Sequence, residues 1–329
     1  MAGFTQIIGQ EHIKAHLQGA IETRMMSHAY ILQGEAGSGK SMIADTFAMT
    51  LVCESGEIEP CMTCHSCKQA ASGNHPDIRH LIPERPDLIK VDEIREQIVN
   101  DVGIKPYSAP YKVYIIPGAD NMNAAAQNAL LKTLEEPPSY VVILLLCRNA
   151  EILLETIRSR CVMLNVRPLK DEQVKQYLMK NLQVPDYQAA SCAAFAGGSI
   201  GRAAMLLEND DFEELRQEVS DLMKNIKSMD IAQIAKETKK IAALSIGLTE
   251  FLDYLVLWYR DVLLYKATGS IEKLLHPEDR QLIMSMAKES SFEGIEKILT
   301  MTEDTKKRLN ANVNTETTLE LLLLSIKEN

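Results

Sequence analysis

The sequence predicts an α/β fold, in which a parallel sheet flanked by helices is followed by helical domains. Short apolar runs alternate with helical patterns over the first half of the 329 residues. A glycine-rich phosphate loop, Gly34-x-x-x-x-Gly39-Lys40-Ser41, joins one such run to a helical pattern. After Val166 only helical patterns remain, up to the end of the chain.

Five apolar runs give the expected strands of the first domain. They are HAYILQG (28–34), DIRHLIP (77–83), KVYIIPG (112–118), YVVILLLC (140–147) and CVMLNV (161–166). The fourth run holds six consecutive aliphatic residues, which is typical of a central parallel strand covered on both faces. In an open sheet of this kind, ligands bind beyond the carboxyl ends of the strands.

The expected helices of this domain lie between the strands. They are SMIADTFAMTLV (41–52), DEIREQIVNDV (92–102) and NAAAQNALLKTLEEPP (123–138). In the second of these, Ile94, Ile98 and Val102 stand four residues apart and share one helix face. Two prolines, Pro137 and Pro138, end the third.

Composition and charge argue against several classes of protein. The net charge of −10 disfavours a protein that coats DNA by bulk electrostatics. The N-terminal residues show no signal-peptide pattern, and a cytoplasmic location is expected. The most apolar C-terminal run, FLDYLVLWYRDVLLYK (251–266), carries internal charges and predicts a buried helix rather than a membrane span. Its aromatic residues Phe251, Tyr254 and Trp258 are expected in a helix core, not on a nucleic-acid stacking face.

The phosphate loop predicts nucleotide binding. Gly34, Gly37 and Gly39 let backbone N–H groups approach phosphate oxygens at a helix N-terminus. The ammonium of Lys40 adds a positive charge, and the hydroxyl of Ser41 is a ligand for Mg²⁺. ATP or ADP with Mg²⁺ is the expected ligand.

The strand KVYIIPG lacks the acids that hydrolysis requires. A hydrolase needs a carboxylate there for Mg²⁺ and a second acid to position water. Pro117 and Gly118 occupy these places, and Asp120 is expected to lie too late in the chain to point into the site. Bound nucleotide is therefore expected not to be turned over by this chain.

A cysteine cluster predicts a structural metal site. Cys53-x₇-Cys61-x₂-Cys64-x₂-Cys67 supplies four thiolates at the spacing that tetrahedral Zn²⁺ uses. A closed four-sulfur shell leaves no open position for catalysis. Free buried thiols and an iron–sulfur cluster are the alternatives.

Several motifs together resemble the clamp-loader branch of the AAA+ ATPases. They are IIGQ (7–10), the phosphate loop, NALLKTLEEPP (128–138), TIRSRC (156–161) and GGSIGRA (197–203). The resemblance implies an AAA+ P-loop domain over 1–166 with an inserted zinc module at 53–67. A small helical lid domain over 167–209 and a helical collar domain for oligomerisation over 210–329 complete the implied organisation.

The resemblance also implies roles for four further residues. Arg160 matches the arginine finger, which reaches the nucleotide of a neighbouring subunit. Arg202 matches the arginine that covers nucleotide from the lid, and an exposed helix arginine is its alternative. Asn149 and Arg148 stand where a polar residue senses the nucleotide, and the sequence does not choose between them.

The implied function is that of a clamp-loader subunit that does not hydrolyse ATP. It would join gamma/tau-type motor subunits and a delta subunit in a heteropentamer that loads the sliding clamp on primed DNA during replication. Two alternatives stay open: an active motor ATPase of the same family, and a zinc-dependent nucleic-acid-binding module. Pro117 and Gly118 disfavour the first, as does the absence of a tail beyond the collar, and the acidic net charge disfavours the second.

Overall fold

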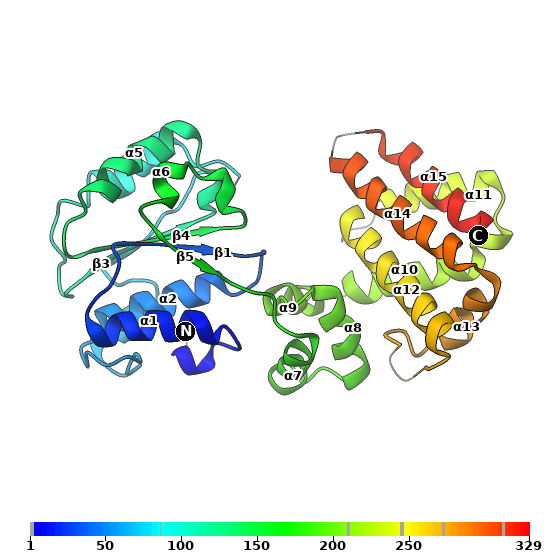
Figure 1. Ribbon diagram of the computed structural model, residues 1–329, viewed down its shortest axis with the longest axis horizontal. Coiled ribbons are helices and arrows are strands. Elements are labelled where there is room, and N and C mark those ends of the chain that lie inside the picture. Colours follow the sequence, from blue (N-terminus) through cyan, green and yellow to red (C-terminus); the bar gives the residue numbers. More distant parts are fainter. Residues whose placement is uncertain (1–2, 86, 209–210, 244–246, 272–273, 311–312) are drawn as a thin grey trace. The chain divides into compact units, whose positions relative to one another are not determined.

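The chain forms two compact units, Met1–Leu169 and Lys170–Asn329 (Figure 1). The computed structural model describes residues 3–85, 87–208, 211–243, 247–271, 274–310 and 313–329. The first unit holds a five-stranded sheet, and the described part of the second holds only helices. The predicted α/β fold followed by helical domains is therefore confirmed, whereas the division of the second unit into lid and collar at residue 209 stays a prediction.

The sheet of the first unit is parallel throughout and has the order β2-β3-β4-β1-β5. The strands are β1 (Ala29–Gln33), β2 (Ile78–His80), β3 (Lys112–Pro117), β4 (Val141–Cys147) and β5 (Val162–Asn165). β1 lies between β4 and β5, with Ile31 opposite Leu145 on one side and Met163 on the other. All five predicted strands are present, and their carboxyl ends meet at one edge.

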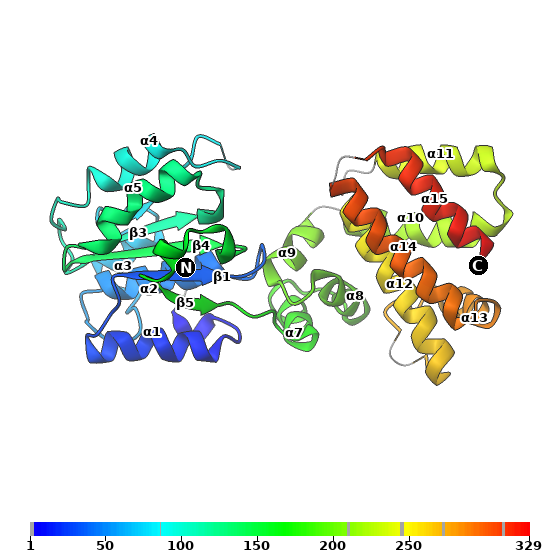
Figure 2. The same cartoon turned by 45° about the horizontal axis from the view of Figure 1, so that its top comes forward.

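Helices cover both faces of this sheet (Figure 2). They are α1 (Glu11–Thr23), α2 (Lys40–Val52), α3 (His65–Ala71), α4 (Val91–Ile94), α5 (Ala124–Glu135) and α6 (Glu155–Arg158). Short turns of other helical types complete the unit: η1 (Phe4–Gln6), the π-helical η2 (Arg95–Val99), η3 (Ala119–Asn121) and η4 (Ala150–Ile152).

The alternation of strand side chains builds a separate core on each face of the sheet. Tyr30 and Leu32 of β1 belong to the cluster that contains Phe47 of α2. Ile31, between them in the strand, belongs to the opposite cluster with Leu130 of α5. Because both faces are buried, β1 and β4 consist almost entirely of apolar residues.

The second unit consists of two sets of helices. The first set is α7 (Asp171–Asn181), α8 (Asp186–Ala196) and α9 (Ile200–Glu208). The second is α10 (Asp211–Asn225), η5 (Ile226–Ser228), α11 (Ile231–Ala242), α12 (Leu248–Thr268), α13 (Arg280–Glu289), α14 (Phe292–Asn310) and α15 (Thr315–Glu328). Within the described residues, no helix is both long enough and apolar enough to cross a bilayer.

Helix α12 forms the centre of the second set. It packs against α10, α13 and α14. Its aromatic side chains Phe251, Tyr254 and Trp258 are fully buried, so the expectation that they form a helix core is confirmed. These aromatic rings are therefore not available for stacking on nucleic acid.

A buried carboxylate, Asp77, fixes the loop that leads into β3. It accepts hydrogen bonds from the backbone N–H groups of Tyr107, Ser108 and Ala109 at 2.5, 2.8 and 2.9 Å. Burial alone would raise the pKa of Asp77, but these donors favour the ionised form and hold its pKa below the ordinary value. The carboxylate thereby ties β2 to the segment before β3.

Replacement of Asp77 by alanine is expected to lower the free energy of unfolding by about 3 kcal/mol at neutral pH, because three backbone donors lose a charged acceptor. A depressed carboxyl pKa stabilises the fold above the ordinary value of 3.8, and this contribution is lost as the pH falls through the lower folded-state pKa. The difference between Asp77→Ala and the unsubstituted protein should therefore shrink in acid. Chemical denaturation at several pH values measures it, and exposed Asp92→Ala is the control. A pH-independent difference would contradict this role.

Candidate nucleotide and metal sites

The phosphate loop lies between β1 and α2, as predicted. The backbone N–H of Gly34 donates to the carbonyl of Cys147 at 3.1 Å and continues the pairing of β1 with β4. Gly37 and Gly39 adopt left-handed φ values of 71° and 91°, which glycine tolerates without strain. The ammonium of Lys40 donates to the carbonyls of Gly34 and Glu35 within the loop. The four residues thus form a compact loop at the N-terminus of a thirteen-residue helix.

A cavity of about 500 Å³ opens beside this loop, at the carboxyl ends of the strands. This volume lies within the range of small-ligand sites. The lining residues come from the loop, from the segments that follow β3 and β4, and from one further loop: Ala36, Lys40, Asp87, Gly118, Asp120, Asn121, Leu146, Cys147 and Arg148. Its position agrees with the ligand site expected for an open parallel sheet.

Asp120 lies in this cavity, and the expectation that it comes too late in the chain to reach the site is wrong. The turn η3 folds the chain back after β3 and returns Asp120 to the edge of the sheet. Its Oδ2 accepts hydrogen bonds from the backbone N–H groups of Arg148 and Asn149 at 2.9 and 3.3 Å. Asp120 therefore links the end of β3 to the end of β4.

Neither residue that follows the aliphatic part of β3 can bind metal through its side chain. Pro117 is the last residue of the strand, and Gly118 adopts a left-handed φ of 62°. A Cβ atom on Gly118 would lie 3.0 Å from the side-chain Nδ2 of Asn121. An acidic residue would therefore not readily adopt the left-handed backbone conformation found at position 118.

The segment after β4 presents Arg148, and not Asn149, to the cavity. The side chain of Asn149 instead accepts a hydrogen bond from the N–H of Glu151 at 2.9 Å and caps η4. Burial lowers the pKa of the Lys40 ammonium, and the positive charge of Arg148 lowers it further. Two cationic side chains therefore face the same cavity.

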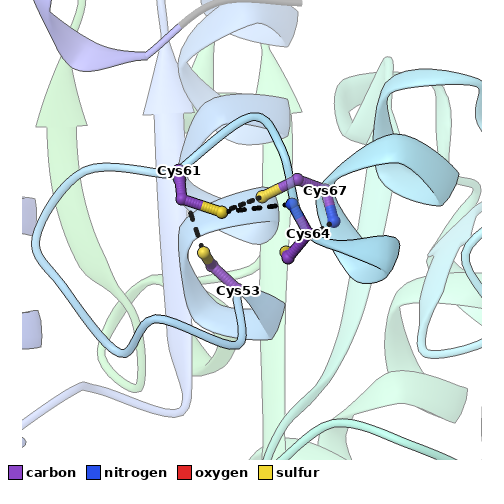
Figure 3. Close-up of side chains that lie close together, drawn as sticks. All are labelled: Cys53, Cys61, Cys64 and Cys67. Atoms are coloured by element: carbon purple, nitrogen blue, oxygen red, sulfur yellow. Dashed lines mark hydrogen bonds between the residues drawn. The ribbon is translucent and has the colours of Figure 1, made fainter.

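The four cysteines converge as their spacing predicts (Figure 3). Cys53 follows the end of α2, Cys61 lies in the next loop, and Cys64 and Cys67 lie at the start of α3. Their sulfur atoms all lie within 4.8 Å of one another. This arrangement brings together one donor from each residue, as a tetrahedral thiolate site requires.

Backbone N–H groups point at sulfur atoms of the cysteine cluster and would stabilise negative charge on them. The N–H groups of Cys61, Cys64 and Cys67 point to the sulfurs of Cys53, Cys61 and Cys64 at 3.4, 3.4 and 3.3 Å. Donors from Thr63 and Cys64 lower the pKa of Cys61 to about 6, whereas burial raises the pKa of Cys67. The donor set fits Zn²⁺, whose positive charge would stabilise thiolates at this cluster.

Arg160 follows α6 and is half-buried at the surface of the first unit. Its guanidinium forms an ion pair with Glu135 of α5 at 2.9 Å and donates to the carbonyl of Thr156 at 2.9 Å. The nearby Arg158 is the other arginine of this segment, and its Nε is buried with no partner among the described residues. Of these two arginines, Arg160 is the one whose guanidinium is paired with a half-exposed carboxylate.

Arg202 is engaged inside the second unit. Its guanidinium lies 2.8 Å from the carboxylate of Asp253 in α12 and 4.9 Å from the ring centre of Phe195. The backbone N–H of Arg202 is also engaged, since it donates to the hydroxyl of Ser199 at 3.1 Å. Its predicted contact with nucleotide stays a prediction, and would require the guanidinium to leave Asp253.

The sequence offered Arg148 and Asn149 as alternative nucleotide sensors, and it predicted that Asp120 would lie outside the site. Asp120 and Arg148 meet because η3 reverses the chain, and no periodic pattern of apolar residues announces such a turn. Gly118 was the one signal in the sequence that could have revealed this turn, since a glycine after a strand often marks a left-handed turn.

Gly118→Ala is expected to lower the free energy of unfolding by about 1–2 kcal/mol, because alanine is strained at a positive φ. Gly103→Ala is the matched control, since a Cβ atom there meets open space. Chemical denaturation of both variants measures the difference. Equal stability of the two variants would contradict the inferred strain of a non-glycine residue at position 118.

Comparison with known proteins identifies the family of the chain. The family described as "DNA polymerase III, delta subunit" matches residues 9–170, and "DNA polymerase III, delta subunit, C terminal" matches residues 211–328. The DNA polymerase III subunit delta' of Bacillus subtilis is 32% identical over 326 residues, which cover 97% of this chain and 96% of that protein.

Other relatives include a second delta' subunit and a tau/gamma subunit. The delta' subunit of Pseudomonas aeruginosa is 32% identical over 309 residues, or 91% of each chain. The tau/gamma subunit of Haemophilus influenzae is 33% identical over 229 residues, which cover 68% of this chain but 33% of that protein. The match to delta' subunits therefore extends over both units, and the chain belongs to the DNA polymerase III delta' subunit family.

Proposed function

We propose that this chain is a clamp-loader subunit that holds nucleotide without hydrolysing it and helps to load the sliding clamp on primed DNA. Membership of the delta' family supports the replication role. The observation that carries the non-hydrolysing part is the end of β3, where Pro117 and the left-handed Gly118 replace the acids of a hydrolytic site.

The intact phosphate loop supports retention of ATP or ADP. Gly34, Gly37 and Gly39 shape the loop, Lys40 stands where a phosphate is held, and Ser41 stands where such loops hold Mg²⁺ when they use it. The cavity of about 500 Å³ beside Lys40 supplies the space. Nucleotide bound here would act as a structural ligand, because Pro117 and Gly118 supply no carboxylate at the end of β3 to activate water.

Arg160 would act in the site of an adjacent motor subunit. In this chain its guanidinium already pairs with the half-exposed carboxylate of Glu135. Transfer to a γ-phosphate exchanges one charge-assisted hydrogen bond for another, so the step needs little net desolvation. An arginine placed in this way stabilises the charge that develops during phosphoryl transfer.

The partners would be gamma/tau-type motor subunits and a delta subunit, in a heteropentamer held together by the C-terminal helices. Relatives among the tau and gamma subunits of DNA polymerase III support this context. The complex would work in the cytoplasm. Contact with the clamp and with DNA would be made by the assembled complex.

The cysteine cluster would hold one structural Zn²⁺. The convergence of four sulfurs within 4.8 Å and the backbone N–H groups directed at three of them support this proposal. The ion would fix the loop between α2 and α3. It would have no open coordination position and hence no role in chemistry.

ATP turnover and assembly test the function as a whole. The isolated chain is expected to hydrolyse ATP no faster than its Lys40→Ala variant, because Pro117 and Gly118 stand at the strand end where acids would bind metal and activate water. Mixed with motor and delta subunits, it should form a defined complex in size-exclusion chromatography. Turnover by the lone chain that disappears in Lys40→Ala would identify it as a motor ATPase instead.

Arg160→Ala is expected to lower the ATP turnover of the reconstituted complex by about tenfold or more, because transition-state charge in the adjacent site loses a donor. Steady-state phosphate release in the presence of primed DNA measures it. Glu135→Gln is the control for loss of the surface ion pair and should leave most of the turnover intact. Arg158→Ala identifies the finger: a larger loss there than in Arg160→Ala would transfer the role to Arg158.

The purified protein is expected to contain about one Zn²⁺ per chain, since one closed four-thiolate shell is present. Cys64→Ser should lower the zinc content and the melting temperature together. Cys161→Ala, outside the cluster, should keep the zinc content unchanged. Elemental analysis and thermal unfolding measure both quantities. A metal-free protein of unchanged melting temperature would contradict the zinc assignment.

A further inference from the structure

The cavity beside the phosphate loop is lined by two cationic residues. Lys40 and Arg148 enter it from two different elements. The guanidinium of Arg148 has no hydrogen-bond or ion-pair partner within the described part of the chain, while its own backbone N–H is fixed on Asp120. The residue is therefore anchored at its backbone, and its charged end remains available to a ligand.

The carboxylates of the cavity are partly committed to other donors. The Oδ2 of Asp120 accepts two backbone hydrogen bonds, which occupy both lone pairs of that oxygen. Asp87 is exposed and forms a two-point contact with Arg85 at 2.9 and 3.3 Å. Asp120 can therefore offer a cation only its Oδ1, and Asp87 would have to leave Arg85 to reach one.

A divalent cation would find few protein ligands here. Mg²⁺ favours near-octahedral oxygen coordination and is usually held by one or two carboxylates together with phosphate oxygens. At the end of β3 these carboxylates are replaced by Pro117 and Gly118. The hydroxyl of Ser41 remains as a ligand, but it is neutral and exposed.

We propose that this site binds the phosphates of a nucleotide without a divalent cation, and that Arg148 neutralises the charge that Mg²⁺ otherwise balances. A guanidinium matches phosphate oxygens through two parallel hydrogen bonds. Together with Lys40 and the N-terminus of α2, it surrounds the phosphates with positive charge from three directions. This inference rests on the proposed binding of nucleotide at the phosphate loop.

Two substitutions separate the contribution of Arg148 from its role in the fold. Arg148→Ala removes the guanidinium but keeps the backbone N–H that Asp120 accepts. Arg148→Lys keeps the positive charge and removes the two-point geometry. Arg95→Ala is the matched control, because Arg95 is also an exposed arginine but does not line the cavity.

The experiment is titration calorimetry of ADP with the full chain, once in excess EDTA and once in Mg²⁺. The affinity of the unsubstituted protein should differ by less than about threefold between the two conditions. In EDTA, Arg148→Ala should bind about tenfold more weakly or worse, Arg148→Lys should fall between, and Arg95→Ala should be unchanged.

Other results overturn the inference in distinguishable ways. Binding by the unsubstituted protein only in Mg²⁺ would reject the metal-free site and leave the proposed nucleotide binding intact. Binding in neither condition would reject nucleotide binding itself, and the inference with it. Metal-free binding that is equal in Arg148→Ala and the unsubstituted protein would reject the assignment of Arg148.

Discussion

The close packing of Gly34 between two neighbouring segments is the constraint on which the nucleotide site depends. Its N–H continues the β1–β4 hydrogen bonding, and a Cβ atom at this position would lie 2.9 Å from the carbonyl oxygen of Val166. Only glycine fits there without displacement of the backbone after β5. Because β1 is thereby held between β4 and β5, the phosphate loop, the end of β3 and the end of β4 share one edge.

Several features of the molecule, including the phosphate loop at this edge, could be predicted from the sequence. The phosphate loop is a contiguous motif, and the convergence of the four cysteines follows from short spacing. The five strands were predicted because burial on both faces makes strands such as β4 continuously apolar. In each of these cases the signal lies within a short stretch of the chain.

The remaining features depend on partners far apart in the sequence. Asp120 meets the N–H of Arg148 across 28 positions, and Arg202 meets Asp253 across 51. No periodicity specifies such pairs, since each is set by a turn or by the packing of helices. In this structure the guanidinium of Arg202 is engaged by Asp253 of α12, so the resemblance of the motif does not by itself place Arg202 on a nucleotide.

Helix α2 connects the two candidate sites mechanically. Its first residue, Lys40, belongs to the phosphate loop, and Cys53 of the cysteine cluster follows its last residue. Thirteen residues span about 20 Å, and the side chains from Thr46 to Val52 are all buried. A metal at the cysteines would therefore fix the far end of the helix whose N-terminus faces the phosphates. Because a close-packed helix transmits displacement rather than absorbing it, such a metal would also help to fix the position of the phosphate loop.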